Sequence, residues 1–521
     1  MKAFRQAALA AALSALFVAQ AWAIGDGPVV KDHVSQSKAE AGDYTFDELF
    51  AHGQEQFSAK FNKYDGQGRP GATGGGAARI PGSAPAFIRT SAPESNSCAG
   101  CHNDPFPGGA GDIVANVFVL AQTLDPVVES VNGEFSNERN TLGMQGSGAI
   151  EMLAREMTAT LQALRDDAKQ QAQSGGHDVQ AELVAKGVHF GHLIAHADGS
   201  VDTSAVEGIN ADLILRPFHQ KGAVVSLREF TNNATNHHHG MESVERFGVE
   251  MTGTADFDQD GVEDELSVGD ITAQTLYQAA LAVPGQVLPD DIDALRAVFY
   301  GEREFENMGC TDCHTPSLKL SSRYFTEPNP YNPAGNLRPE DVDQLISFDL
   351  TSQGQKPRLE GTPDGGAVVR AYTDLKRHDL CDDELKHYCN EQVPQAGIST
   401  RQFLTRKLWD VGNSAPYGHR GDLTTLTEAI EAHGGEARAS RDAFVNGSQQ
   451  QRDEVVEFLK SLQMLPPGTE SNVVDASMQS VDKAALWSVF QEEELTATKP
   501  GPSALCDGQE KRRGCGTVGK H

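Results

Sequence analysis

The chain has 521 residues and carries 73 Asp and Glu against 43 Lys and Arg, which gives a formal net charge of −30 at pH 7. A charge of this sign argues against binding to nucleic acid or to an anionic membrane surface. The length is sufficient for two domains of ordinary size, each with its own hydrophobic core.

Residues 1–23 have the pattern of a secretory signal peptide. Lys2 and Arg5 form a basic head, a short apolar run follows, and Ala21-Trp22-Ala23 offers a cleavage site with small residues at its first and third positions. A retained N-terminal anchor is the alternative, but the run is short for a membrane span, and no later stretch is long and apolar enough for one. The sequence therefore predicts a periplasmic or secreted protein without a membrane span.

The chain contains two C-x-x-C-H motifs, from Cys98 to His102 and from Cys310 to His314. Two thiols at this spacing can add to the two vinyl groups of a haem, and the adjacent histidine can then ligate the iron. A zinc site or a thioredoxin-like pair would need a second matching cysteine pair or a βαβ setting, and the sequence offers neither. The motifs predict two covalently bound haem c groups. Their attachment residues are Cys98, Cys101, Cys310 and Cys313, and their proximal iron ligands are His102 and His314.

Apolar periodicity predicts four main helices. They are expected over residues 44–62, 148–173, 290–306 and 438–463, and the last is typical of the helix that closes a cytochrome c domain. The segment between the first helix and the first motif is rich in Gly, Pro, Ala and Ser and predicts a long loop. Short strands are expected within residues 184–215, including Leu213-Ile214-Leu215, and the chain after Pro466 is expected to be irregular.

The four remaining cysteines form two pairs that are close in sequence, Cys381 with Cys389 and Cys506 with Cys515. In an oxidising compartment such pairs most simply form local disulfide bonds, and free buried thiols are the alternative. We expect both pairs to be disulfide-bonded.

Residues 256–265 have the pattern D-x-D-x-D-G-x-x-D-E of a calcium-binding loop. Alternating carboxylates can surround a hard cation, and the glycine permits the sharp turn between them. Ser267 stands where an EF-hand has its bidentate Glu, and an acidic solvated turn is the alternative. The candidate Ca²⁺ ligands are Asp256, Asp258, Asp260 and Asp264.

The two halves of the chain resemble each other beyond the haem motifs. Gly53-x-x-x-Phe57 precedes the first motif as Gly301-x-x-x-Phe305 precedes the second. A turn at residues 218–222 leads five residues later into Leu227, and a similar turn at residues 417–421 leads five residues later into Leu426. The pattern indicates a duplicated fold with one haem in each copy.

Three segments, residues 301–314, 372–380 and 408–437, resemble the bacterial di-haem cytochrome c peroxidase superfamily. The likeness extends to its di-haem thiol oxidoreductase/peroxidase branch and, more distantly, to the rubber oxygenases. It implies a mainly α fold of two cytochrome c-like haem domains from an internal duplication, with short β insertions in the first. The expected organisation is a signal peptide (1–23), an N-terminal haem domain with the Gly-rich and calcium-type loops (24–288), a C-terminal haem domain (289–465) and an irregular tail (466–521).

The resemblance also suggests a distal ligand for the second haem. In the family, a Thr-Leu-x-Glu-Ala-Val helix is followed three residues later by an iron ligand, and that position holds His433 here. We expect His433 to ligate the second haem, and capping of the helix before Gly434 is the alternative. Alignment of Leu227 with Leu426 puts Ala234 at the equivalent position of the first copy, where alanine cannot bind iron.

A histidine cluster, His237, His238 and His239, follows Ala234. One of these side chains could act as a distal ligand or as an acid/base group over an open iron, and a solvated loop is the alternative. Family members with peroxidase activity have a Glu before the Met at this helix end, whereas here Gly240 precedes Met241 and Glu242 follows it. The candidate catalytic residues are His237, His238, His239 and Glu242.

The resemblance implies an oxidoreductase enzyme, in which electrons pass through the C-terminal haem to a reactive N-terminal haem that acts on peroxide or an organic substrate. A Trp that the family has between its haems aligns with Gln220, so an aromatic relay is absent at that position. The expected partners are a small redox protein or a quinol-linked electron donor or acceptor. Two alternatives stay open, a di-haem cytochrome that only transfers electrons and a di-haem oxygenase of an apolar substrate.

Overall fold

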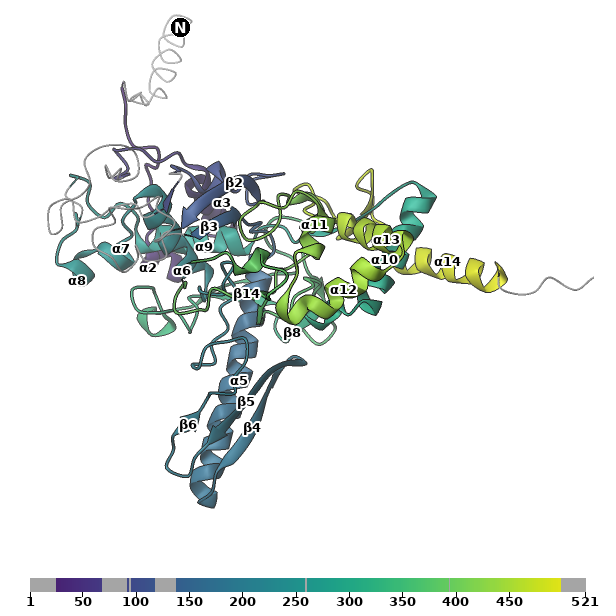
Figure 1. Cartoon of the computed structure of the whole chain (residues 1–521). Coiled ribbons are helices and arrows are strands. Elements are labelled where there is room, and N and C mark those ends of the chain that lie inside the picture. The colour runs from purple at the N-terminus through teal and green to yellow at the C-terminus, as the bar shows by residue number, and fades with distance from the viewer. Residues whose placement is uncertain are drawn as a thin grey trace, which may run out of the picture. The chain divides into compact units, whose positions relative to one another are not determined.

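The computed structural model describes residues 25–67, 91–92, 95–117, 137–257, 260–392 and 394–497 (Figure 1). The predicted signal peptide, Asp258 and the predicted Cys506–Cys515 disulfide lie outside these ranges. The chain divides into two compact units, one that ends at Ser480 and one that begins at Val481. No helix within the described ranges has the length and the apolar character needed to cross a membrane.

The helices of the first unit are α2 (Gln36–Glu40), α3 (Phe46–Ser58), α5 (Ser147–Gly175), α6 (Leu227–Ala234), α7 (Val244–Phe247), α8 (Val249–Thr252), α9 (Val268–Ala279), α10 (Ile292–Asn307), α11 (Leu426–Glu431), α12 (Arg438–Asn446) and α13 (Gln449–Ser461). Short 3₁₀ turns are η1 (Cys98–Gly100), η3 (Cys310–Asp312), η4 (Pro339–Asp341), η5 (His387–Cys389), η6 (Val411–Asn413) and η7 (Gly435–Ala437), and η2 (Thr235–His239) is a π-helical turn. The second unit contains α14 (Lys483–Ala497), where an irregular tail was expected.

The strands are short and form small sheets of two or three strands. They are β1 (Ser91–Ala92), β2 (Gly111–Val117), β3 (Asn137–Thr141), β4 (Val179–Ala185), β5 (Val188–Ala195), β6 (Val201–Asp202), β7 (Gly285–Leu288), β8 (Leu318–Leu320), β9 (Tyr324–Glu327), β10 (Ile346–Asp349), β11 (Glu360–Gly361), β12 (Ala367–Val369), β13 (Arg377–Asp379), β14 (Gln402–Leu404), β15 (Leu462–Gln463) and β16 (Val473–Asp475). The sheets are β1-β2-β3, β4-β5-β6, β11-β12-β8, β10-β9 and β13-β14, all antiparallel, and the mixed sheet β15-β7-β16.

The short β insertions expected in the first half are present as β1 to β6, but the second half also contains strands that were not expected, because β8 to β14 lie between Leu318 and Leu404. Each of these strands has two to four residues, which is too short for an alternating apolar pattern to be recognised in the sequence. The predicted strand at residues 213–215 is also absent. Leu213 has a φ of 60°, which no strand accommodates, although Leu213 and Leu215 are buried as the apolar pattern implied.

Three predicted helices are found close to their expected bounds as α3, α5 and α10. The fourth, expected as one helix over residues 438–463, is divided into α12 and α13. Gly447 ends α12 with an extended backbone, and Ser448 begins α13 with a capping box in which its hydroxyl accepts from the Gln451 N–H. Helix α9 was missed because it is buried on almost every side, so that its sequence carries no apolar stripe.

Each C-x-x-C-H motif follows a helix that crosses a second helix at a glycine. In α3, a Cβ on Gly53 would lie 2.1 Å from the Ala273 carbonyl oxygen of α9. In α10, a Cβ on Gly301 would lie 1.8 Å from the Glu454 carbonyl oxygen of α13. Only glycine permits backbones to approach this closely. The repeated Gly-x-x-x-Phe pattern therefore builds the same helix crossing in front of η1 and η3.

A phenylalanine one turn after each glycine completes the two crossings. Phe57 packs against Tyr277 of α9, with ring centroids 5.2 Å apart, and Phe305 packs against Phe458 of α13 at 5.5 Å. Both phenylalanines are buried. The packing holds each helix pair at a fixed angle, which positions the motif that follows.

Helix α5 and the sheet β4-β5-β6 form an arm. Figure 1 shows α5 running away from the other helices with this sheet lying along it. The face between them is apolar and contains Leu161 and Ala168 of α5 with Leu183 and Phe190 of the sheet. The N-terminal half of α5 is instead buried among the other helices, where Leu153 and Met157 have no exposed surface.

Strand β7 connects the two halves of the chain. It pairs antiparallel with β15 and parallel with β16, both of which come from the C-terminal part. The expected domain boundary at residue 288 falls at the end of β7, within the compact unit that ends at Ser480. The two parts therefore share backbone hydrogen bonds in addition to side-chain packing.

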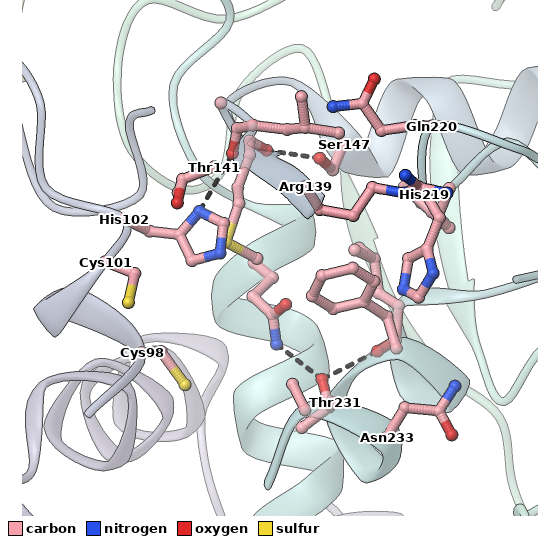
Figure 2. A pocket seen from close by; sticks show the side chains of 18 of the residues that line it. Cys98, Cys101, His102, Arg139, Thr141, Ser147, His219, Gln220, Thr231 and Asn233 are labelled. Atoms are coloured by element: carbon pink, nitrogen blue, oxygen red, sulfur yellow. Dashed lines mark hydrogen bonds between the residues drawn. The ribbon is translucent and has the colours of Figure 1, made fainter. Parts of the chain in front are cut away.

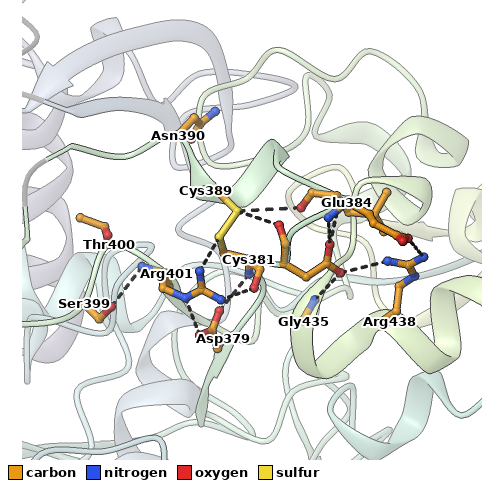
Figure 3. The surroundings of a disulfide bond; sticks show 12 residues. Asp379, Cys381, Glu384, Cys389, Asn390, Ser399, Thr400, Arg401, Gly435 and Arg438 are labelled. Atoms are coloured by element: carbon orange, nitrogen blue, oxygen red, sulfur yellow. Dashed lines mark hydrogen bonds and ion pairs between the residues drawn. A yellow bond between two sulfur atoms is a disulfide. The ribbon is translucent and has the colours of Figure 1, made fainter.

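The Cys381–Cys389 disulfide is present, as the sequence predicted. Figure 3 shows it beside Arg401, which donates to the Asp379 carboxylate and to the Cys381 carbonyl oxygen. The bond closes a short loop that contains Tyr388, a buried residue. This loop forms part of the wall of a cavity described below.

Loss of this disulfide is expected to lower the free energy of unfolding by about 2.5 kcal/mol, the chain-entropy value for a loop of this length. Replacement of both Cys381 and Cys389 by serine should lower the midpoint of urea unfolding accordingly. The matched control is the unchanged protein under reducing conditions, which should shift in the same direction. An unchanged midpoint in the double variant would contradict the prediction.

Candidate haem sites

The first haem motif lies at a large cavity, with a volume of about 1630 Å³ including space that is open to solvent. Its wall comes from η1, the segment after β3, the turn before α6, α6 itself and η2 (Figure 2). The residues that matter for its chemistry are Cys98, Cys101, His102, Arg139, His219, Gln220, Ala234, His237, His238, His239, Gln395, Arg406 and Lys407.

The second haem motif lies at a second cavity of about 1420 Å³, measured in the same way. Its wall comes from η3, β13, β14, the turn at residues 416–419 and α11. The residues that matter here are Cys310, Cys313, His314, His378, Tyr388, Arg406, Lys407, His419 and His433. The structure thus brings each predicted attachment motif to a cavity of its own.

His102 and His314 have the same hydrogen-bond arrangement. Nδ1 of His102 lies 3.0 Å from the Leu142 carbonyl oxygen, and Nδ1 of His314 lies 3.0 Å from the Tyr372 carbonyl oxygen. Because a carbonyl only accepts, each Nδ1 carries the hydrogen and each Nε2 keeps its lone pair. This is the tautomer that proximal metal ligands adopt, and the carbonyl orients the ring.

Burial keeps these rings neutral and the adjacent thiols protonated. Desolvation lowers the pKa of His102 and of His314 to about 4. Desolvation, with a smaller contribution from the neighbouring Cys101, raises the pKa of the Cys98 thiol to about 12, and burial raises that of Cys310 to about 12. A neutral imidazole beside two half-buried thiols, at the edge of a large cavity, fits the attachment of a haem.

The two cavities adjoin. Residues 140–143, residues 404–407 and Gln220 contribute to the walls of both. Lys407 holds two of these segments together, because its Nζ donates to the carbonyl oxygens of Gly143 (2.8 Å) and Gln145 (2.9 Å). Burial lowers the pKa of Lys407 to about 8. Arg406 and Lys407 are thus buried cationic groups that could face the carboxylates of a haem in either cavity.

The C-terminal ends of α11 and α6 carry different residues at equivalent positions, His433 in the second copy and Ala234 in the first. His433 lines the second cavity, and its Nδ1 lies 2.7 Å from the Ala429 carbonyl oxygen, so Nε2 keeps its lone pair. Burial lowers the pKa of His433, which favours the neutral form, and its ring interacts electrostatically with His314. Ala234 lines the first cavity at the equivalent position and offers no ligand atom.

The three histidines of the cluster have different surroundings. His237 and His238 line the first cavity, and burial lowers the pKa of His237 to about 3 and that of His238 well below its usual value. His239 also lines this cavity, and its ring is directed toward the attachment motif. Its Nδ1 lies 2.6 Å from the Ser95 carbonyl oxygen and its Nε2 lies 3.4 Å from Cys98 Sγ.

Glu242 does not line the first cavity, contrary to its selection as a catalytic candidate. It is buried beside the calcium-type loop, where its carboxylate accepts from the Phe257 N–H at 3.1 Å. Met241, which follows η2 and its cap Gly240, packs in a separate apolar cluster with Phe61 and Leu266, and this directs the following residue away from the cavity.

The calcium-type loop is held by its own carboxylates. Asp256 accepts from the N–H groups of Asp260 and Gly261, at 3.2 and 3.1 Å. Burial raises the pKa of Asp260, and the charge of Asp256 raises it further. Asp264 has a φ of 49°, as a sharp turn requires. Ca²⁺ binding by these residues and Asp258 stays a prediction.

Sequence reasoning missed His219 as a site residue. It lies in the turn before α6 and lines the first cavity, and Figure 2 shows it across the pocket from His102. The signal that could have found it is its position in the repeated turn, where the second copy has Gly418. Gln220, the residue aligned with the family's Trp, is buried in the wall between the two cavities.

The model of a family described as "Di-haem oxidoreductase, putative peroxidase" matches residues 362–462. The match includes β13, β14, α11 and His433. No curated protein matches the chain.

Two solved structures show distant likeness. A hydrazine synthase of Kuenenia stuttgartiensis, pressurised with xenon, is 15% identical, with 85% of this chain and 97% of that chain covered and a TM-score of 0.33. A MauG-like protein associated with microbial copper homeostasis is 14% identical, with 63% and 90% covered and a TM-score of 0.23. Residues 362–462 are therefore similar to a family of di-haem oxidoreductases, which agrees with the superfamily resemblance that the sequence predicted.

Proposed function

We propose that this chain is an exported di-haem c-type oxidoreductase whose two haems have different tasks. One haem is attached at Cys98 and Cys101 and the other at Cys310 and Cys313, in two domains that arose by duplication. Bound haem supplies an iron that exchanges electrons and, where an axial position is open, binds a small molecule. The residues around the two cavities decide which of these tasks each site performs.

The observation that carries the proposal is the difference between the two equivalent helix ends. His433 presents a neutral imidazole with its lone pair on Nε2 in the cavity of His314, which suits a site with two protein ligands. Such a site exchanges electrons with little rearrangement. Ala234 leaves the cavity of His102 without a ligand from this position, so that a substrate has access to it. The second site therefore transfers electrons and the first site reacts.

Two further features support this division of tasks between the two sites. The shared walls at residues 140–143 and 404–407 keep the two sites close enough for electron transfer. His237 and His238 provide polar groups over the first site for acid/base chemistry on peroxide or on an organic substrate.

The net charge of −30 suits a basic redox protein as partner, and a quinol-linked donor or acceptor is the other candidate. A Ca²⁺ ion at Asp256, Asp258, Asp260 and Asp264 would brace the connection between the halves.

The EPR spectrum of the ferric protein tests the proposal. We expect one high-spin and one low-spin signal of equal weight, and one CO bound per chain after reduction. The double variant Cys98→Ala/Cys101→Ala should lose the high-spin signal and the CO binding and keep the low-spin signal. Two low-spin signals without CO binding would overturn the proposal in favour of a cytochrome that only transfers electrons.

A further inference from the structure

His219 stands at a position of the repeated turn where the second copy has glycine, Gly418. The turns before α6 and α11 are closed by equivalent bridges, from Phe218 to Val224 and from Tyr417 to Leu423. The second residue of each turn has a positive φ, 65° at His219 and 80° at Gly418. Glycine adopts this conformation without strain, whereas a residue with a Cβ does so at a cost in stability. A strained residue at the wall of a reactive site indicates a function for its side chain.

The side chain of His219 is held at the far wall of the first cavity. Its ring packs edge-on against Phe230 of α6, with centroids 5.2 Å apart. Figure 2 places it across the pocket from the Cys98–His102 motif. His237 and His238 line the same cavity as His219.

The hydrogen bonds of His219 determine which ring nitrogen carries the hydrogen. Arg139, which can only donate, lies with Nη2 3.3 Å from Gln395 Oε1 and so orients this amide. The amide nitrogen of Gln395 then donates to His219 Nδ1 at 3.1 Å. The hydrogen of His219 is therefore on Nε2, for which no described residue is an acceptor.

His219 is thus the opposite tautomer to His102, His314 and His433, in which Nδ1 donates to a carbonyl and Nε2 keeps the lone pair. An Nε2 that carries hydrogen cannot ligate iron, but it can donate a hydrogen bond. Burial, reinforced by the charge of Arg139, lowers the pKa of His219 to about 4, so the ring stays neutral near pH 7.

We propose that His219 is the hydrogen-bond donor, through Nε2–H, to a small ligand with an acceptor atom that enters the first cavity, and that it is not an iron ligand. The ligand class is a small neutral or anionic molecule such as a peroxide, for which cyanide is the probe. Gln395 and Arg139 are positioning residues, because they fix the tautomer of His219. This inference rests on the proposed function, which places a haem with an open position in this cavity.

Cyanide titration of the ferric holoprotein tests the role of His219. In His219→Gly the backbone adopts the conformation of Gly418 without strain, so the variant is expected to fold. Loss of the donor should raise the dissociation constant of cyanide about tenfold or more, because a hydrogen bond to a charged acceptor contributes at this level. His219→Asn is the matched variant. Asparagine tolerates a positive φ and keeps an N–H donor, so its affinity should lie closer to that of the unchanged protein.

The outcomes separate this inference from the function on which it rests. If the unchanged protein binds no cyanide although two haems are attached, the proposed function fails. If it binds one cyanide per chain and His219→Gly binds it with equal affinity, only the role of His219 fails. A low-spin ferric signal that His219→Gly converts to high-spin would show that His219 is an iron ligand and would also overturn the inference.

Discussion

Replacement of His433 by alanine is expected to abolish the low-spin signal of the ferric protein and to leave both haems high-spin. The reason is the geometry of the second cavity, in which the carbonyl of Ala429 fixes the hydrogen of His433 on Nδ1. Under the proposed function, the Nε2 lone pair would be available to a haem iron attached at this cavity, with His314 as the other protein ligand. Alanine supplies no ligand, as Ala234 supplies none in the first copy.

A second histidine of the same cavity provides the control for this experiment. His419 is buried and lines the cavity, but its Nε2 lies 2.8 Å from Asn390 Oδ1. Because this oxygen only accepts, Nε2 of His419 carries the hydrogen and cannot ligate iron. His419→Ala should therefore keep the low-spin signal. An unchanged spectrum in His433→Ala would show that His433 only caps α11.

Replacement of Gly301 by alanine is expected to destabilise the protein by about 2 kcal/mol, with an overpacking cost at the upper end of its range partly offset by helix propensity. The new Cβ would lie 1.8 Å from the Glu454 carbonyl oxygen and 2.9 Å from the Phe458 Cβ, so α10 and α13 must separate. Overpacking of this kind costs about 1–3 kcal/mol and occasionally more, and it exceeds the gain of about 1 kcal/mol that alanine has over glycine in helix propensity.

Urea unfolding of the holoprotein measures this loss. Gly53→Ala should behave in the same way, because its Cβ would lie 2.1 Å from the Ala273 carbonyl oxygen in the equivalent crossing. Ala297→Gly in α10 controls for helix propensity alone and should cost about 1 kcal/mol. A gain in stability in Gly301→Ala would mean that the two helices are not in close contact.

Much of the architecture could be predicted because its signals lie within short stretches of the sequence. The two C-x-x-C-H motifs carry their function in five consecutive residues, so no knowledge of the fold is needed to recognise them. Helices α3, α5 and α10 have one apolar face and therefore a visible period. The disulfide between Cys381 and Cys389 joins residues that are close in sequence. Helix α9 and the strands from β8 to β14 escaped prediction because uniform burial or short length removes the period.

The sequence by itself determined the two attachment motifs, the repeated turns and the contrast between His433 and Ala234. Only the tertiary structure decided what each histidine can do, because the tautomer depends on partners that are distant in sequence. His102 receives its carbonyl from Leu142, and His219 receives its donor from Gln395. Contacts of this kind arise when the chain folds, and no local pattern encodes them.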